Sequence, residues 1–269
     1  MDDYFQANRE LWDQWTGQHE QSSFYDVAGF KAGKERLNSI ELTELGDVHG
    51  KTLLHLQCHF GLDTLAWARH GAAVTGVDFS EPAIALAQSL SRELNIPAQF
   101  YCSDISRLPD HLSGEFDIIF TSYGVLHWLN DLRRWAEVIA YFLKPGGIFY
   151  IVEDHPFMRV FDAGDEQHLR AAFPYFFTET PDKLENMSSY ASDGQAQTTT
   201  FYNWNHSLSE VINTLLEAGL QLEFLHEFPF ASRSKFPGMV EGEDKWWRFT
   251  DQRHEMVPML FSLQARKPG

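Results

Sequence analysis

Residues 52–78 contain a polar turn and a carboxylate whose spacing would let both contact one ligand. An apolar run at residues 52–56 leads into a turn closed by Gly61, and a helical pattern then precedes a second apolar strand that ends at Asp78. In open parallel sheets, ligands bind in the crevice beyond the carboxyl ends of the strands. We therefore expect Asp78 to face the turn and to accept hydrogen bonds from the ribose diol of a nucleotide-like cofactor.

The composition of the turn limits the kind of cofactor. A pyrophosphate requires successive small residues, so that backbone amides can close around it. This turn has Gln57, His59 and Phe60 where a dinucleotide fingerprint would place glycines, and only Gly61 remains. The turn therefore favours an adenosine ligand without a phosphate group.

The stretch HLQCHFG at residues 55–61 resembles motif I of class I S-adenosylmethionine-dependent methyltransferases. Gly61 and Asp78 match the family pattern, whereas His55 replaces its usual acidic residue and Gln57 and His59 replace its glycines. The resemblance covers most of residues 51–156 and resumes from 207 to 269. It implies S-adenosylmethionine as cofactor, with S-adenosylhomocysteine as product.

The resemblance also implies roles for residues that follow the other strands. Phe79 and Ser80 would lie beside the adenine, Asp104 would accept from its amino group, and Ile105 would donate its backbone amide. The end of the fourth strand would pass under the sulfonium. The expected cofactor site comprises Gln57, Cys58, His59, Gly61, Asp78, Phe79, Ser80, Asp104, Ile105, Ser122 and Tyr123.

Some of these residues also have purely structural interpretations. Asp78 could cap the helix that begins near Pro82, and Asp104 could bond to the backbone of its own turn. His55 lies within an apolar strand and is expected to be a hydrogen-bonded core residue. His55, Cys58 and His59 do not suggest a metal site, because they straddle a strand-to-loop junction and no CxxC pair supports them.

The remaining pattern predicts an α/β fold. Further strands are expected at residues 99–102, 116–120, 148–152, 222–228 and 256–265, and helices at 35–45, 83–94, 129–143 and 208–218. This alternation predicts a Rossmann-like, doubly wound, seven-stranded, mostly parallel sheet with helices on both faces and an antiparallel last strand. Around a core at 51–155 and 207–269, we expect an N-terminal helical cap at 1–50 and a lid insertion at 156–206.

Aromatic residues of the cap and the lid are candidates for the roof of the pocket. Trp12, Trp15, Tyr25, Tyr202 and Trp204 could exclude water and stabilise a sulfonium through their ring faces, although about half of such residues are expected only to pack. A roofed, apolar pocket favours a small or medium-sized metabolite as the methyl acceptor.

A catalytic base is optional, since the electrophile of methyl transfer resides in the cofactor. His127 is the leading candidate because it follows the fourth strand, with a structural role at a helix start as an equal alternative. His155, just beyond the fifth strand, and Tyr202 are weaker candidates that could instead bind substrate.

Composition restricts partners and location. The 269 residues carry a formal net charge of −17, which argues against a nucleic-acid partner because phosphate backbones are held chiefly by Lys and Arg. We expect a cytoplasmic protein, because the chain has two cysteines, an N-terminus without a basic and apolar leader, and no long apolar run. We expect it to be a monomer or a homodimer. Two other functions remain open: a non-methylating enzyme with a sulfonium cofactor, and a non-catalytic interaction protein.

Overall fold

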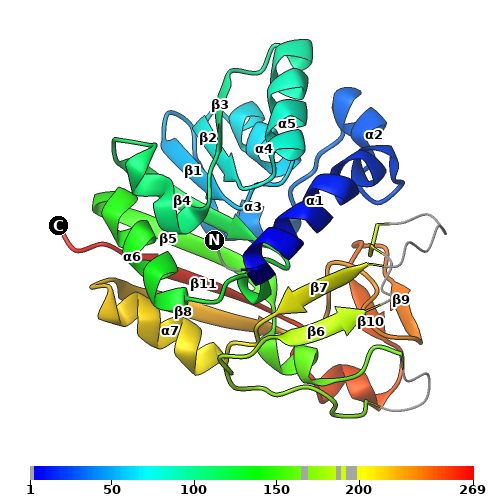
Figure 1. Cartoon of the computed structure of the whole chain (residues 1–269). Coiled ribbons are helices and arrows are strands. Elements are labelled where there is room, and N and C mark those ends of the chain that lie inside the picture. The colour runs from blue at the N-terminus through cyan, green and yellow to red at the C-terminus, as the bar shows by residue number, and fades with distance from the viewer. Residues whose placement is uncertain (1–2, 165–168, 186–188, 192–198) are drawn as a thin grey trace.

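A seven-stranded sheet forms the centre of the computed structural model, which describes residues 3–164, 169–185, 189–191 and 199–269 (Figure 1). The strand order is β3-β2-β1-β4-β5-β11-β8, and β11 is antiparallel to both of its neighbours. The strands are β1 (Thr52–Leu56), β2 (Ala73–Asp78), β3 (Ala98–Cys102), β4 (Phe116–Ser122), β5 (Leu143–Asp154), β8 (Gln221–Phe228) and β11 (Leu260–Arg266). The predicted fold class is confirmed. The last strand begins four residues later than predicted, because Met256 still closes a 3-10 turn.

Helices cover both faces of the sheet. The helices α3 (Ser39–Leu45), α4 (Leu62–Arg69) and α5 (Glu81–Leu94) pack on one face, and α6 (Leu132–Phe142) and α7 (Leu208–Glu217) on the other. In β1, Leu53 joins the first of these cores, whereas Leu54 and Leu56 join the second. Burial of one such leucine side chain contributes about 1.5–3 kcal/mol.

Capping residues explain why two predicted helices are shorter than expected. The helix predicted at 35–45 is α3, whose Asn38 and Glu41 form a capping box at its start. The helix predicted at 129–143 is α6, which begins after Asp131, whose side chain accepts a hydrogen bond from the amide of Arg134. A short 3-10 helix, η2 (Leu126–Trp128), precedes it.

The N-terminal residues form α1 (Asp3–Gln21) and α2 (Val27–Lys31). In Figure 1, α1 crosses the molecule between α5 and β7, and it contacts both. Within the described chain, no helix combines the length and apolar character needed to cross a bilayer.

Two β-hairpins lie beyond α1 (Figure 1). The predicted lid region contains η3 (Pro156–Val160) and the hairpin of β6 (Asp182–Glu185) with β7 (Thr200–Asn203). Most of its polar stretch at 188–200 lies outside the described residues. The second hairpin, β9 (Met239–Glu241) with β10 (Trp247–Phe249), falls within a segment that the sequence analysis left without assigned elements. The remaining 3-10 turns are η1 (Ile105–Asp110) and η4 (Gln252–Glu255).

We expect Gly76→Ala in β2 to destabilise the protein by about 1–3 kcal/mol, because its new methyl group would overpack the core. A Cβ at this position would lie 2.7 Å from the Phe100 ring and 2.9 Å from Cys58 Sγ. The matched control is Gly17→Ala in α1, where a Cβ would meet nothing within 4 Å. There, helix propensity predicts a gain of about 1 kcal/mol. Urea unfolding of both variants checks the prediction, and equal effects at the two sites would contradict it.

Candidate active site

A cavity of about 1430 Å³ opens where the C-terminal ends of the central strands meet α1 and the segments around both hairpins. Pockets for a single small ligand usually measure about 300–1,000 Å³. The cavity therefore has room for a cofactor and a second molecule. Its lining includes the turn after β1 and the residues that follow β2, β3, β4 and β5.

The turn after β1 has the backbone of a glycine-rich loop although it contains a single glycine. Gln57, His59 and Gly61 have φ angles of 56°, 51° and 77°, all in the left-handed region. This conformation costs a residue with a side chain about 1–2 kcal/mol. At Gly61 no side chain fits, because a Cβ would lie 2.6 Å from Cε1 of Phe100.

The side chain of Gln57 reaches across the cavity floor. Its Nε2 donates to the carbonyl of Val125 at 3.1 Å, and among the described residues its buried Oε1 has no hydrogen-bond partner. An unpaired buried acceptor is costly, and it is available to a donor on a ligand. The replacement of a glycine by Gln57 thus adds a polar contact point to the loop.

His59 connects the same loop to α1. Its Nε2 lies 2.9 Å from Nδ1 of His19, whose Nε2 lies 2.6 Å from the hydroxyl of Ser189. Burial lowers the pKa of His19 to about 4 and that of His59 well below its ordinary value. Both imidazoles are therefore neutral at pH 7, and the chain of contacts fixes the loop without adding charge.

Asp78 lies at the end of β2, directly opposite the loop. Its Oδ2 accepts from the amide of His59 at 2.8 Å and its Oδ1 from the amide of Ser80 at 3.0 Å. Burial raises the pKa of Asp78 to about 6, although the two amides act in the opposite direction. Each carboxylate oxygen has a second acceptor position, so the group can still accept hydrogen bonds from a diol.

The residues after β3 also line the cavity. Asp104 caps η1 by accepting from the amide of Ser106 at 2.8 Å, which is the local turn contact considered from the sequence. Asp104, Ile105 and Phe79 lie on the cavity wall near the end of β2. Phe79 is held edge-on by Phe5 of α1, with 5.4 Å between their ring centroids.

The end of β4 is positioned by a buried carboxylate from the neighbouring strand. The oxygens of Glu153 accept from the amides of Gly124, Val125 and Leu126, at 2.5, 2.7 and 3.2 Å. Just before this loop, Tyr123 donates its hydroxyl to a carboxylate of α3. Glu153 therefore fixes the loop that would pass under the sulfonium.

His55 and Ser122 occupy the floor beneath the loop. Nδ1 of His55 lies 2.8 Å from the hydroxyl of Thr64, and burial lowers its pKa to about 3. The hydroxyl of Ser122 is 3.5 Å from Nε2 of His55 and also 3.5 Å from Asp63. His55 is thus a neutral, hydrogen-bonded core residue, as expected from the sequence.

His127 lies in η2 and lines the cavity beside Asp154. Its pKa is lowered well below the ordinary value, mainly by burial and then by the charges of Arg159, Lys235 and Arg233. The imidazole is therefore neutral and can accept a proton.

Three of the predicted roof residues line the cavity, namely Trp12, Trp15 and Tyr25. Trp12 packs edge-on against Trp128 at 5.4 Å and against His59 at 5.1 Å between ring centroids. An aromatic wall therefore stands next to the loop after β1.

The structure places four other predicted site residues away from the main cavity. Ser80 is buried as the N-cap of α5 and donates to Asp13 at 2.6 Å. His155 is buried with its Nε2 2.8 Å from a carboxylate oxygen of Glu227, and it caps η3. Tyr202 and Trp204 pack around Tyr4 at the outer side of β7, with Trp204 reaching only a small neighbouring cavity.

Sequence reasoning missed several charged residues of the cavity. They are Arg36 and Asp63 near the loop, and Asp154, Arg159, Arg233 and Lys235 beside His127. Asp154 ends β5, where a carboxylate at a strand end was a usable signal. The others lie in irregular segments or face inward from a helix, where no periodic pattern marks them. Within the described part of the chain, no cluster of His, Cys, Asp or Glu has the arrangement of a metal site.

Comparisons with known proteins agree with this geometry. Residues 54–151 match the family model described as a methyltransferase domain. An uncharacterized methyltransferase of Synechocystis is 33% identical over 125 residues, covering 46% of this chain and 56% of the relative. A ubiquinone biosynthesis O-methyltransferase of Coxiella burnetii is 38% identical over 98 residues, covering 36% and 41%. This chain thus spans about half the length of the curated relatives it matches.

The fold comparison extends over nearly the whole chain. The crystal structure of an S-adenosylmethionine-dependent methyltransferase from Clostridium acetobutylicum superposes with a TM-score of 0.59, at 13% identity, covering 96% of this chain and all of the other. The sheet order and the cavity at its C-terminal edge define a Rossmann-like class I fold. Residues 54–151 thus match a methyltransferase domain, within a chain whose fold is that of a solved S-adenosylmethionine-dependent methyltransferase.

The strained loop leads to a stability prediction. We expect Gln57→Gly to be about 1 kcal/mol more stable than Gln57→Ala, because only glycine adopts a φ of 56° without a steric penalty. Both variants remove the same side-chain contacts, so their difference reports the backbone alone. The control pair is Gln14→Gly and Gln14→Ala in α1, where helix propensity reverses the order by about the same amount. Chemical unfolding measures all four; the same order at both positions would contradict the assigned loop geometry.

Proposed function

We propose that the protein transfers a methyl group from S-adenosylmethionine to a small or medium-sized metabolite. The observation that supports this most strongly is the pairing of the left-handed loop at residues 57–61 with the buried Asp78 carboxylate. This pairing provides a ribose acceptor and a close backbone approach without a pyrophosphate cradle.

The residues of the cavity fit this cofactor. Asp78 would accept from the ribose hydroxyls, and Phe79, Asp104 and Ile105 would surround the adenine. The unpartnered Oε1 of Gln57 matches the ammonium group of the methionine moiety, which is a donor that needs an acceptor. Near the same loop, Nε of Arg36 lies 3.1 Å from a carboxylate oxygen of Asp63 and offers a cation for the methionine carboxylate.

The bound cofactor supplies an electrophilic methyl group on a positively charged sulfur. The protein has to align the acceptor with that group, exclude water and remove a proton when the acceptor carries one. Trp12, Trp15 and Tyr25 form an aromatic wall that excludes water and faces cationic groups favourably. His127 is neutral, lines the cavity and follows β4, so it is the base that we assign.

The acceptor itself is proposed to be a metabolite because the cavity is roofed by α1 and surrounded by both hairpins. One curated relative is named for ubiquinone biosynthesis, which is a small-molecule pathway. The net charge of −17 makes a nucleic acid an unfavourable substrate.

Calorimetric titration with S-adenosylhomocysteine and with adenosine tests the cofactor assignment. We expect both to bind the wild type and Asp78→Asn to weaken both at least tenfold, because the ribose loses a charged acceptor. Glu81→Gln, an exposed carboxamide substitution near the start of α5, is the matched control and should leave both affinities unchanged. If the wild type binds neither ligand at millimolar concentration, the interaction-protein alternative replaces the enzyme.

The raised pKa of Asp78 adds a pH dependence to the same titration. The ionised carboxylate is the better acceptor, so adenosine affinity should fall as the pH decreases through about 6. In the ligand-free protein, the stability of the fold depends on pH with the opposite sign. Because the folded-state pKa of Asp78 lies above the ordinary 3.8, its protonation increases the free energy of unfolding as the pH falls from about 6 towards 4. Asp78→Asn should flatten both profiles. An adenosine affinity that is constant between pH 5 and 8 in the wild type would contradict the assigned role.

The proposed base is tested by His127→Gln. With an acceptor found by a metabolite screen, we expect single-turnover methyl transfer to slow by about 10²–10⁴-fold, while S-adenosylhomocysteine affinity stays the same. An unchanged rate would show that His127 only packs beside η2. Product mass in the same assay separates methyl transfer from a non-methylating reaction.

A further inference from the structure

Three cationic side chains gather in the part of the cavity beside His127. Arg159 lies in η3, the 3-10 helix that follows β5, whereas Arg233 and Lys235 lie between β8 and β9. All three side chains line the cavity beside His127. The charge of Arg233 lowers the pKa of Arg159, of Lys235 and of His127, so these groups lie close enough to interact. Positive charges this close together are unfavourable unless negative groups of the protein or of a ligand compensate them. They stand out in a chain whose net charge is −17.

The protein neutralises only part of this charge. Lys235 Nζ forms an ion pair with Oδ2 of Asp154, and both side chains are almost fully buried. Glu153 also lies nearby, but its oxygens are occupied by backbone amides and its pKa is raised by burial and by Asp154. Among the described residues, Asp154 thus forms the one direct ion pair with these cations, and its charge also acts on Arg233 and Arg159.

Arg159 is held in place by neutral groups. Its Nε donates to Oδ1 of Asn205 at 3.3 Å, and the Asn203 amide, in the orientation that satisfies both neighbours, accepts from its Nη2 at 3.1 Å. These amides orient the guanidinium without cancelling its charge. Burial accordingly lowers the pKa of Arg159, although it stays fully protonated.

Arg233 interacts with the carboxylate of Asp154 through its charge, without a direct ion pair among the described residues. Its guanidinium lies over the ring of Tyr190, 4.7 Å from the centroid. Over the described residues it has neither a hydrogen-bond acceptor nor a carboxylate partner. A guanidinium offers a planar fork of donors that matches a carboxylate, so this one is available to a ligand.

We propose that Arg233, assisted by Arg159, binds a carboxylate group of the methyl acceptor and so selects organic acids as substrates. This rests on the proposed function, because it assigns the loop end of the cavity to the cofactor. Asp154 stands beside the cations and would repel a dianion, which favours a carboxylate over a phosphate. Met158 and Phe236 line the same end and fit an apolar body on the acid.

The experiment compares aromatic acids with their neutral amides. Benzoate, phenylacetate and cinnamate, each paired with the corresponding amide, are titrated calorimetrically into protein saturated with S-adenosylhomocysteine. We expect at least one acid to bind at least tenfold more tightly than its amide. Arg233→Gln should weaken that acid at least tenfold and leave S-adenosylhomocysteine affinity and thermal stability unchanged.

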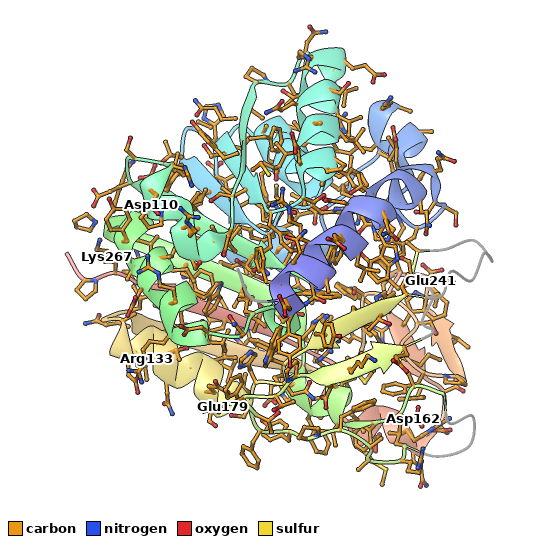
Figure 2. All side chains as sticks on the ribbon, viewed as in Figure 1. Asp110, Arg133, Asp162, Glu179, Glu241 and Lys267 are labelled. Carbon is orange, nitrogen blue, oxygen red and sulfur yellow. The ribbon has the colours of Figure 1, made fainter. Side chains whose placement is uncertain are left out.

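The matched control is Arg133→Gln, which removes the same charge from an exposed position of α6, where Arg133 pairs with Glu217 at 3.6 Å. Figure 2 shows Arg133 on the side of the molecule opposite Glu241 of β9. It should alter neither affinity. Arg233→Lys, which keeps the charge but loses the fork, should recover only part of the binding.

Three results would overturn the proposal. These are acids and amides binding equally or not at all, inorganic phosphate binding more tightly than the acids, and Arg233→Gln weakening S-adenosylhomocysteine instead of the acid. The last would assign Arg233 to the methionine carboxylate. A wild type that binds no S-adenosylhomocysteine removes the proposed function, while the same acid titrations without that ligand still decide whether the cationic end binds carboxylates.

Discussion

The contact on which the site depends most is the one between the Asp78 carboxylate and the backbone amides of His59 and Ser80. It joins the loop after β1 to the end of β2, two segments that parallel pairing brings side by side. The amide of His59 points at Asp78 only because the loop adopts left-handed backbone angles. Burial of the carboxylate raises its pKa to about 6, so the protein maintains this arrangement against a desolvation cost. A group held at such a cost is typical of a binding site rather than of a scaffold.

The loop shows how a family geometry can persist without the family residues. Gln57 and His59 retain backbone angles that glycine would adopt freely, and other contacts offset the strain. His59 contacts His19 of α1, and Gln57 donates to the carbonyl of Val125 after β4. The side chains that replaced glycines therefore couple the loop to two further walls of the cavity, which glycines cannot do. This coupling joins α1 to the loop that we propose binds the cofactor.

How much of the site could be predicted depends on which of its interactions join residues that are close in sequence. The strand, turn and helix around Gly61 could be predicted because hydrophobic periodicity and turn chemistry are local properties. Asp78 and Asp104 were proposed for the same reason, since Asp78 ends β2 and Asp104 comes shortly after β3, and both line the cavity. His155 also follows a strand, yet it turns away from the cavity towards Glu227. Its orientation depends on β8, which is remote in sequence. Arg159, Arg233 and Lys235 lie in segments without periodicity, and only the folded chain brings them together.

The cavity lining combines groups that suit a cationic ligand with groups that suit an anionic one. Beside the loop after β1, where we propose that the cofactor binds, lie aromatic rings, two neutral histidines and the Asp78 carboxylate, which suit a sulfonium, together with the ion pair of Arg36 with Asp63. The guanidinium groups of Arg159 and Arg233 form no direct ion pair among the described residues and would attract an anion. His127 lies beside these cations, which lower its pKa further. The same charges that would attract an acidic acceptor therefore keep the proposed base unprotonated, so binding and proton removal draw on one electrostatic arrangement.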